Sequence, residues 1–277
     1  MAMTRITQPL RDVAAWTASF GAAEIPVLAH SAEAVEALRA NEDDVDANMI
    51  GETLSGDPLM TLRVLIHSST HRSARMVTEP ETVTAAVVMM GTGPFFRAFG
   101  PLPAVEETLQ DRPEALAGLR AVMKRAHRAA NFALGFAVRR MDHDAAVIHH
   151  AALLHDFAEM LLWCHAPDLA LRIRQAQDSD PTLRSSVIQK DVLNVTLSDL
   201  QQSLMHTWHL PQRLARMTDR RHAEHPSAKS VLLAIRLARH TSLGWDNAAL
   251  PDDIRDVAAL LNISELACTE VLQDLDT

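Results

Sequence analysis

The stretch 145–165, AAVIHHAALLHDFAEMLLWCH, decides the fold class of this chain. Its apolar residues lie on nearly every side of a helix, a pattern that is typical of a buried helix and not of a surface one. Asp144 precedes it as a candidate cap, and Pro167 follows its end. We therefore predict one continuous helix, Ala145–His165, in the core of a helical domain. The pair His155-Asp156 would stand in its middle, where an acid is rarely buried unless it is paired or binds a metal.

The composition of the 277-residue chain also favours helices. Aromatic residues make up 4% with no Tyr, and only 9 glycines are present, so side chains suited to strands and residues suited to tight hairpins are scarce. The net charge of -9 argues against non-specific nucleic-acid binding. Cys164 and Cys268 lie too far apart in sequence to indicate a disulfide framework or a zinc ribbon. We find no signal-peptide core and no apolar run of membrane length, which predicts a cytoplasmic protein without a membrane span.

Helix-start signals occur in the N-terminal part of the chain. Asp57 is followed by Pro, the combination of a capping acid and a proline at the first helical position. Thr78 and Glu81 form a capping-box pattern before an apolar segment, Thr82–Met90. These signals predict helices that begin at each of these points.

The segment Gly91–Pro103 is rich in Gly and Pro and separates these helices from a long helical pattern, Pro113–Arg140. We take it as a connector between two lobes. The sequence thus predicts an all-α, two-lobed multi-helix bundle. The N-terminal helical lobe would be residues 1–103, and the C-terminal helical lobe would be residues 104–277.

The C-terminal segment has a helix-turn-helix pattern, with helices expected at Asp252–Leu261 and Ser264–Leu275. From residue 251 to the end it holds seven acids and a single base, Arg255. A DNA-recognition helix needs basic residues to contact the phosphates. We therefore expect a terminal helix pair packed on the second lobe, and no DNA binding.

The His155-Asp156 pair belongs to an ordered series of motifs. His127 precedes the pair, and Trp208-His-Leu-Pro211 and His222 follow it; upstream stand Ile25-Pro-Val-Leu28, Gly56-Asp-Pro-Leu-Met-Thr61 and Ala85-Ala-Val-Val-Met-Met-Gly91. In their order and spacing these motifs resemble the HD superfamily and, more narrowly, its HD-related output domain, HDOD, over about residues 20–275. The resemblance implies a bacterial signal-transduction protein with an HD-superfamily-like C-terminal lobe.

The resemblance also implies where a metal would bind in an active relative. Active HD enzymes hold a divalent metal on a His, a His-Asp pair and a later Asp, and hydrolyse phosphoester bonds. Here His127 matches the first His and His155-Asp156 the pair, but Arg239 stands where the later Asp is expected. A guanidinium is permanently charged and cannot ligate a cation, whereas it can pair with Asp156. We therefore regard His127, His155 and Asp156 as vestigial candidates, and expect an Asp156–Arg239 ion pair, no catalytic residue, no metal and no other cofactor.

Other positions depart from the pattern of active relatives too. Glu159 stands near the place of a Lys that often follows the pair, and Arg221 replaces one of two neighbouring histidines, leaving His222. Together with Arg220 these two residues form a candidate anion-binding site. The simpler interpretation of this basic stretch is a solvated helix face.

The leading functional hypothesis is a regulatory, non-enzymatic signalling module with a degenerate metal site. Because no receiver, cyclase or kinase motif is present, its signalling partners would be supplied in trans. The alternative is a metal-dependent phosphohydrolase that acts on a nucleotide or cyclic dinucleotide. In that case Fe, Mn or Mg would bind to His127, His155 and Asp156, with His150 or His222 completing the site. A third hypothesis is a sensor that binds a small nucleotide without turnover.

Overall fold

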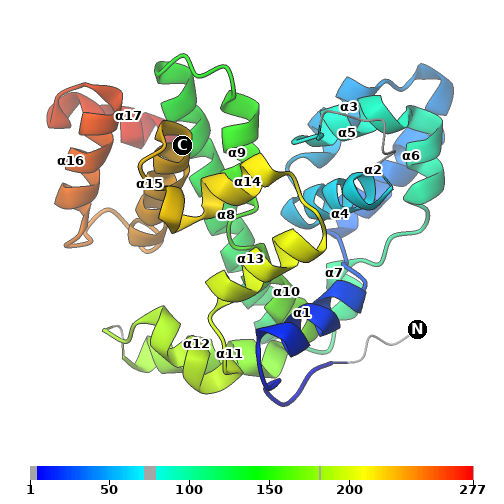
Figure 1. Ribbon diagram of the computed structural model, residues 1–277, viewed down its shortest axis with the longest axis horizontal. Coiled ribbons are helices and arrows are strands. Elements are labelled where there is room, and N and C mark those ends of the chain that lie inside the picture. Colours follow the sequence, from blue (N-terminus) through cyan, green and yellow to red (C-terminus); the bar gives the residue numbers. More distant parts are fainter. Residues whose placement is uncertain (1–4, 72–78, 181, 277) are drawn as a thin grey trace. The chain divides into compact units, whose positions relative to one another are not determined.

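The computed structural model of the chain describes residues 5–71, 79–180 and 182–276. Within these ranges every regular element is a helix, and the one extended pairing is an isolated bridge between Val27 and Ala104 (Figure 1). The predicted all-α fold class is confirmed. No helix of the described ranges is long and apolar enough to cross a membrane.

The chain divides into two compact units that do not follow the predicted lobes. The first unit comprises Met1–Val122 and Asp156–Leu210, and the second comprises Met123–His155 and Pro211–Thr277. The boundary that we expected at residue 103 lies inside the first unit. The two lobes stay a prediction. The long helix α8 (Pro113–Arg139) contributes to both units and ends one residue before the predicted end.

The first unit begins with a group of short helices around an apolar core. They are α2 (Ala29–Arg39), η1 (Glu42–Asp44), α3 (Ala47–Leu54), α4 (Pro58–Thr70), α5 (Val83–Met90) and α6 (Thr92–Ala98). Asp57 begins α4 as predicted, because its carboxylate accepts from Leu59 N at 2.8 Å and from Met60 N at 3.1 Å. Its other oxygen accepts from Leu28 N at 2.8 Å, which ties the start of α4 to the start of α2.

The start of α5 and the segment after it differ from the helices predicted for this core. Thr82, and not a residue further upstream, is the N-cap of α5, since its hydroxyl accepts from Ala85 N at 3.1 Å. Thr78 of the predicted capping box lies outside the described residues. The predicted connector contains a helix, α6, because Phe95 and Phe96 are buried in the core and fold the segment onto it.

The rest of the first unit consists of helices from the start of the sequence and from its middle part. It contains α1 (Val13–Ala22), α7 (Val105–Thr108), α10 (Phe157–His165), α11 (Pro167–Ser179), α12 (Ser185–Leu193) and α13 (Leu197–Thr207). Helix α1, for which we predicted no element, packs on α13. The indole Nε1 of Trp16 donates to Leu193 O at 2.9 Å, so a buried hydrogen bond holds α1 to the end of α12.

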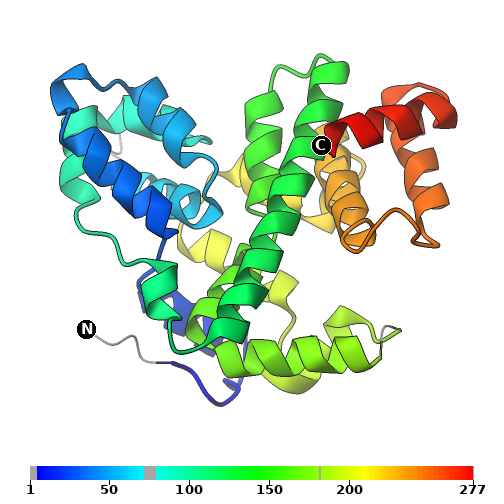
Figure 2. The same cartoon turned by 180° about the vertical axis from the view of Figure 1, so that it is seen from behind.

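The second unit is organised around one helix, α15 (Pro226–His240). Besides the C-terminal part of α8, its other elements are α9 (Ala145–Leu153), α14 (Gln212–Thr218), η2 (Arg220–His222), α16 (Leu250–Leu261) and α17 (Glu265–Leu275). Helix α15 packs against α9, α14 and α16, and lies between α9 and α16 (Figure 1). The predicted terminal helix pair is confirmed as α16 and α17, drawn in orange and red in Figure 2. Asn262 ends α16 in the left-handed conformation, and the Ser264 hydroxyl caps α17.

Candidate functional site

The central helix predicted from the sequence is in fact two helices. Helix α9 ends at Leu153, a turn follows, and α10 begins at Phe157, so His155-Asp156 lies in the turn and not in mid-helix. The break left no trace in the apolar pattern because both helices are buried and both carry apolar residues all round. Asp144 stands at the N-cap position of α9 as predicted, but its carboxylate pairs with Arg213 of α14 and makes no capping hydrogen bond to α9.

The turn places Asp156 at the N-cap position of α10. Its backbone lies at φ -105° and ψ 22°, and the residue is 9% exposed. The N-terminus of a helix carries a partial positive charge, which favours a carboxylate at this point. The start of α10 can therefore stabilise the buried carboxylate of Asp156 whether or not a metal binds there.

His127 of α8 and the neighbouring His149 and His150 of α9 belong to the second unit. His127 Nδ1 lies 2.8 Å from Met123 O, and His150 Nδ1 lies 2.7 Å from Ala146 O. Because a carbonyl only accepts, each Nδ1 carries a proton. His150 Nε2 is buried and has no hydrogen-bond partner within the described ranges. Burial, followed by the charges of His150 and His127, lowers the pKa of His149 to about 4, so this ring is neutral at pH 7.

These donors do not make up a complete metal site. Among the residues that the structure describes, no group of three or more His, Cys, Asp or Glu is placed to hold a metal ion. The sequence resemblance adds that Arg239 stands where an active HD enzyme has its second carboxylate, and that replacement stays a prediction. The described residues therefore do not fit the metal that active HD enzymes hold.

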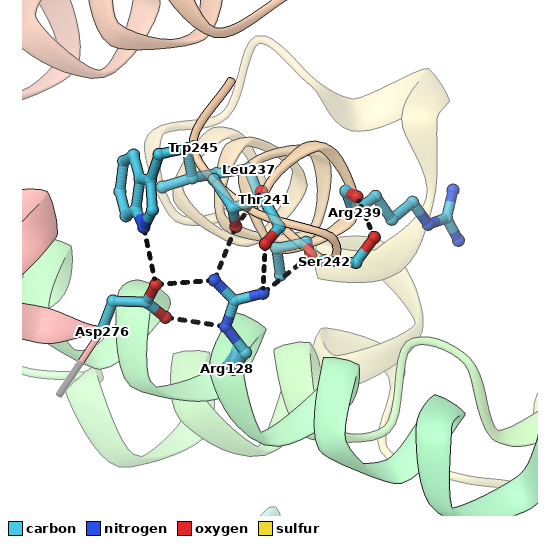
Figure 3. A network of polar contacts seen from close by, with 8 residues as sticks. Arg128, Leu237, Arg239, Thr241, Ser242, Trp245 and Asp276 are labelled. Carbon is cyan, nitrogen blue, oxygen red and sulfur yellow. Dashed lines mark hydrogen bonds and ion pairs between the residues drawn. The ribbon is translucent and has the colours of Figure 1, made fainter. Parts of the chain in front are cut away.

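Arg239 lies in the last turn of α15, where its side chain is exposed. Figure 3 shows this side chain extending away from the neighbouring polar network, while its backbone oxygen accepts from Ser242 Oγ at 2.8 Å. Asp156 belongs to the first unit and Arg239 to the second. The ion pair between them stays a prediction.

A polar network that the sequence did not reveal lies one residue from His127. Arg128 donates from Nε and Nη2 to the two carboxylate oxygens of Asp276, both at 2.7 Å, and from Nη1 to Thr241 O at 3.0 Å (Figure 3). Trp245 Nε1 donates to Asp276 at 3.1 Å. We call Arg128, Thr241, Trp245 and Asp276 the Arg128 clasp. It joins the helix that carries His127 to the end of the helix that carries Arg239.

The candidate anion-binding residues form the short helix η2. Arg220, Arg221 and His222 are all exposed. Arg221 Nε donates to Asp219 at 2.9 Å, and its backbone N–H bonds to the same carboxylate. An anion would have to compete with Asp219 for Arg221, a geometry that favours a solvated helix face. The anion site stays a prediction.

Comparison with known proteins decides the family. The sequence profile of the HDOD domain matches residues 25–224, most of the chain. The chain belongs to the HDOD domain family. No match was found among the curated proteins. The family assignment confirms the resemblance drawn from the sequence motifs.

Solved structures show the same HDOD fold at low sequence identity. The MmoQ response regulator of Methylococcus capsulatus is 18% identical with a TM-score of 0.64, over 86% of this chain and 98% of that chain. A virulence factor of Campylobacter jejuni is 16% identical with a TM-score of 0.62, over 96% of this chain and 98% of that chain. At such identities the likeness concerns the fold alone.

Proposed function

We propose that this HDOD protein is a bacterial, cytoplasmic signal-transduction module that acts by binding a protein or ligand, without catalytic turnover. Membership of the HDOD family supports a role in signalling, as does the name of one structural relative, a response regulator. The proposed absence of turnover rests on Arg239, which by the sequence resemblance stands where an active HD enzyme has its later metal-binding Asp.

The physical reason is the requirement of metal-assisted hydrolysis. A catalytic cation needs enough ligands to be held and one open position for an activated water. Replacing a carboxylate with a guanidinium removes one ligand and adds a like charge that repels the cation. Asp156 would pair with Arg239, since a bidentate contact satisfies both groups. The His155-Asp156 turn would then be a structural element and no longer a reaction centre.

The partners of such a module are proteins supplied in trans, with a small nucleotide as a further candidate ligand. Nucleic acid is a poor candidate, because the chain has a net charge of -9 and the segment from residue 251 to the end carries seven acids against one base. The exposed residues Arg220, Arg221 and His222 are the candidate anion contacts.

An assay of phosphodiester hydrolysis tests this proposal. The purified chain is incubated with bis-p-nitrophenyl phosphate or a cyclic dinucleotide, in the presence of Mn²⁺, Fe²⁺ or Mg²⁺. We expect no turnover above that of the Asp156→Ala variant. Turnover that Asp156→Ala abolishes would establish the alternative, a metal-dependent phosphohydrolase. Thermal stabilisation by one nucleotide without hydrolysis would favour a ligand sensor over a module that binds only proteins.

A further inference from the structure

A groove in the first unit is formed by α4, the end of α6 and the segment before α2. Its volume is about 280 Å³. One face of α4 contributes Arg63, Ile66, His67 and Thr70, which recur at the spacing of neighbours on a helix. We call it the Arg63 groove. It is distinct from the His155-Asp156 turn and involves none of the residues discussed above for metal or anion binding.

The cation of the groove has a weak ionic partner. Arg63 is half-buried, with a side chain 23% exposed, and its Nη1 donates to Ile25 O at 2.6 Å, which fixes the guanidinium at the groove. Its other terminal nitrogen lies 3.5 Å from Glu24, whose side chain is 62% exposed. A long contact to a solvated carboxylate contributes little. A ligand carboxylate could take that place and form a shorter, charge-assisted bond.

The wall beside Arg63 is built from rings. His67 packs edge-on against Phe99, with ring centroids 5.2 Å apart, and stacks on His71 at 4.1 Å. Burial, and then the charges of His71 and Arg63, lowers the pKa of His67, which favours the uncharged form of its imidazole. Ile25 and Ile66 add apolar surface. Flat rings beside a fixed guanidinium suit a flat ring that bears an acid.

We infer that the Arg63 groove binds a small carboxylic acid with a planar ring, whose carboxylate replaces Glu24 on Arg63 and whose ring packs against His67 and Phe99. The volume lies just under the range of roughly 300–1,000 Å³ for drug-sized ligands, which suits a molecule of one ring. This inference does not depend on the proposed function, because it concerns different residues. Binding in the groove is expected whether or not the chain has catalytic activity.

Fluorine NMR with 4-fluorobenzoate as the probe tests the inference on the full chain. We expect saturable binding with a Kd on the order of 1 mM, as befits a ligand of this size. The neutral amide, 4-fluorobenzamide, should bind more weakly. Arg63→Gln should weaken the binding of 4-fluorobenzoate roughly ten-fold or more, because it removes a charge-assisted bond. Arg97→Gln is the matched control, since Arg97 is an exposed arginine of α6 that does not line the groove.

Glu24→Gln provides a test of opposite sign that leaves Arg63 in place. Removing the competing carboxylate should tighten the binding of 4-fluorobenzoate roughly two- to five-fold. Glu24 is exposed, so this variant keeps the inference testable even if Arg63→Gln does not fold, which its melting curve would show. Absence of saturable binding by the wild-type chain would overturn the inference. So would binding that neither variant changes, or that Arg97→Gln weakens as much as Arg63→Gln.

Discussion

The Arg128 clasp leads to a prediction about the C-terminus. Asp276 follows the last residue of α17, where the helix carries a partial negative charge and a carboxylate is unfavourable. Arg128 offsets this with two hydrogen bonds of 2.7 Å, and Trp245 adds a third at 3.1 Å. The side chains of Arg128 and Asp276 are only 19% and 14% exposed, so water cannot replace these bonds fully.

The magnitude of the loss lies between that of a surface and a buried ion pair. Exposed pairs contribute about 0–1 kcal/mol, whereas removing one partner of a buried pair costs about 3–5 kcal/mol. For Asp276→Asn, which keeps one acceptor oxygen, we expect the free energy of unfolding of the second unit to fall by about 2 kcal/mol. Glu270→Gln is the control, because Glu270 is an exposed acid of the same helix, and we expect it to change stability by less than about 0.5 kcal/mol.

A double-mutant cycle in urea isolates the contact. Arg128→Gln, Asp276→Asn and the double variant are unfolded in parallel, and hydrogen exchange of the amides of α17 shows where stability is lost. We expect a coupling energy of about 1.5 kcal/mol or more. A coupling below about 0.5 kcal/mol, or an effect of Asp276→Asn equal to that of Glu270→Gln, would refute the reasoning.

Two further predictions concern the buried rings. Burial lowers the pKa of both His149 and His165 from 6.5 to about 4, so the folded chain binds fewer protons than the unfolded chain between these values. Their contribution to the free energy of unfolding is complete above pH 6.5 and is lost as pH falls toward 4, by roughly 3 kcal/mol each. The urea concentration at the unfolding midpoint should therefore fall between pH 7.5 and pH 4. A midpoint that rises on acidification would contradict this prediction. A Cβ at Gly118 would lie 2.5 Å from the Trp163 ring, so Gly118→Ala should destabilise the chain by about 1–3 kcal/mol although Ala favours helices. Gly56→Ala, which meets no atom within 4 Å, is the control, and equal melting temperatures for the two variants would contradict the clash.

The local signals in the sequence were sufficient for most helices. The Asp57 cap, the long apolar pattern that became α8 and the terminal pair α16–α17 lie where they were predicted. The break between α9 and α10 was not predictable in the same way, since a turn between two buried helices leaves the apolar pattern continuous. Helix α1 was missed because its residues, which lie near the start of the chain, were not recognised as a separate helical pattern.

The candidate sites also differ in how far the sequence alone could predict them. The motif order identified the family, because it depends on residue type at a position, and the replacement of a metal ligand by Arg239 stays a prediction of the same kind. The Arg128 clasp depends on contacts between residues as far as 148 positions apart, and the Arg63 groove depends on three segments brought together by folding. Neither leaves a signal in local sequence.

Metal content is the measurement that tests the central claim most directly. The full chain is incubated with excess Mn²⁺ or Fe²⁺, passed through a desalting column and analysed for bound metal per chain, beside the Asp156→Ala and Arg239→Asp variants. With Arg239 in place of a carboxylate ligand, the wild-type chain should retain no more metal than Asp156→Ala, and a restored acid in Arg239→Asp should increase retention. Stoichiometric metal on the wild-type chain that is lost in Asp156→Ala would contradict a degenerate site.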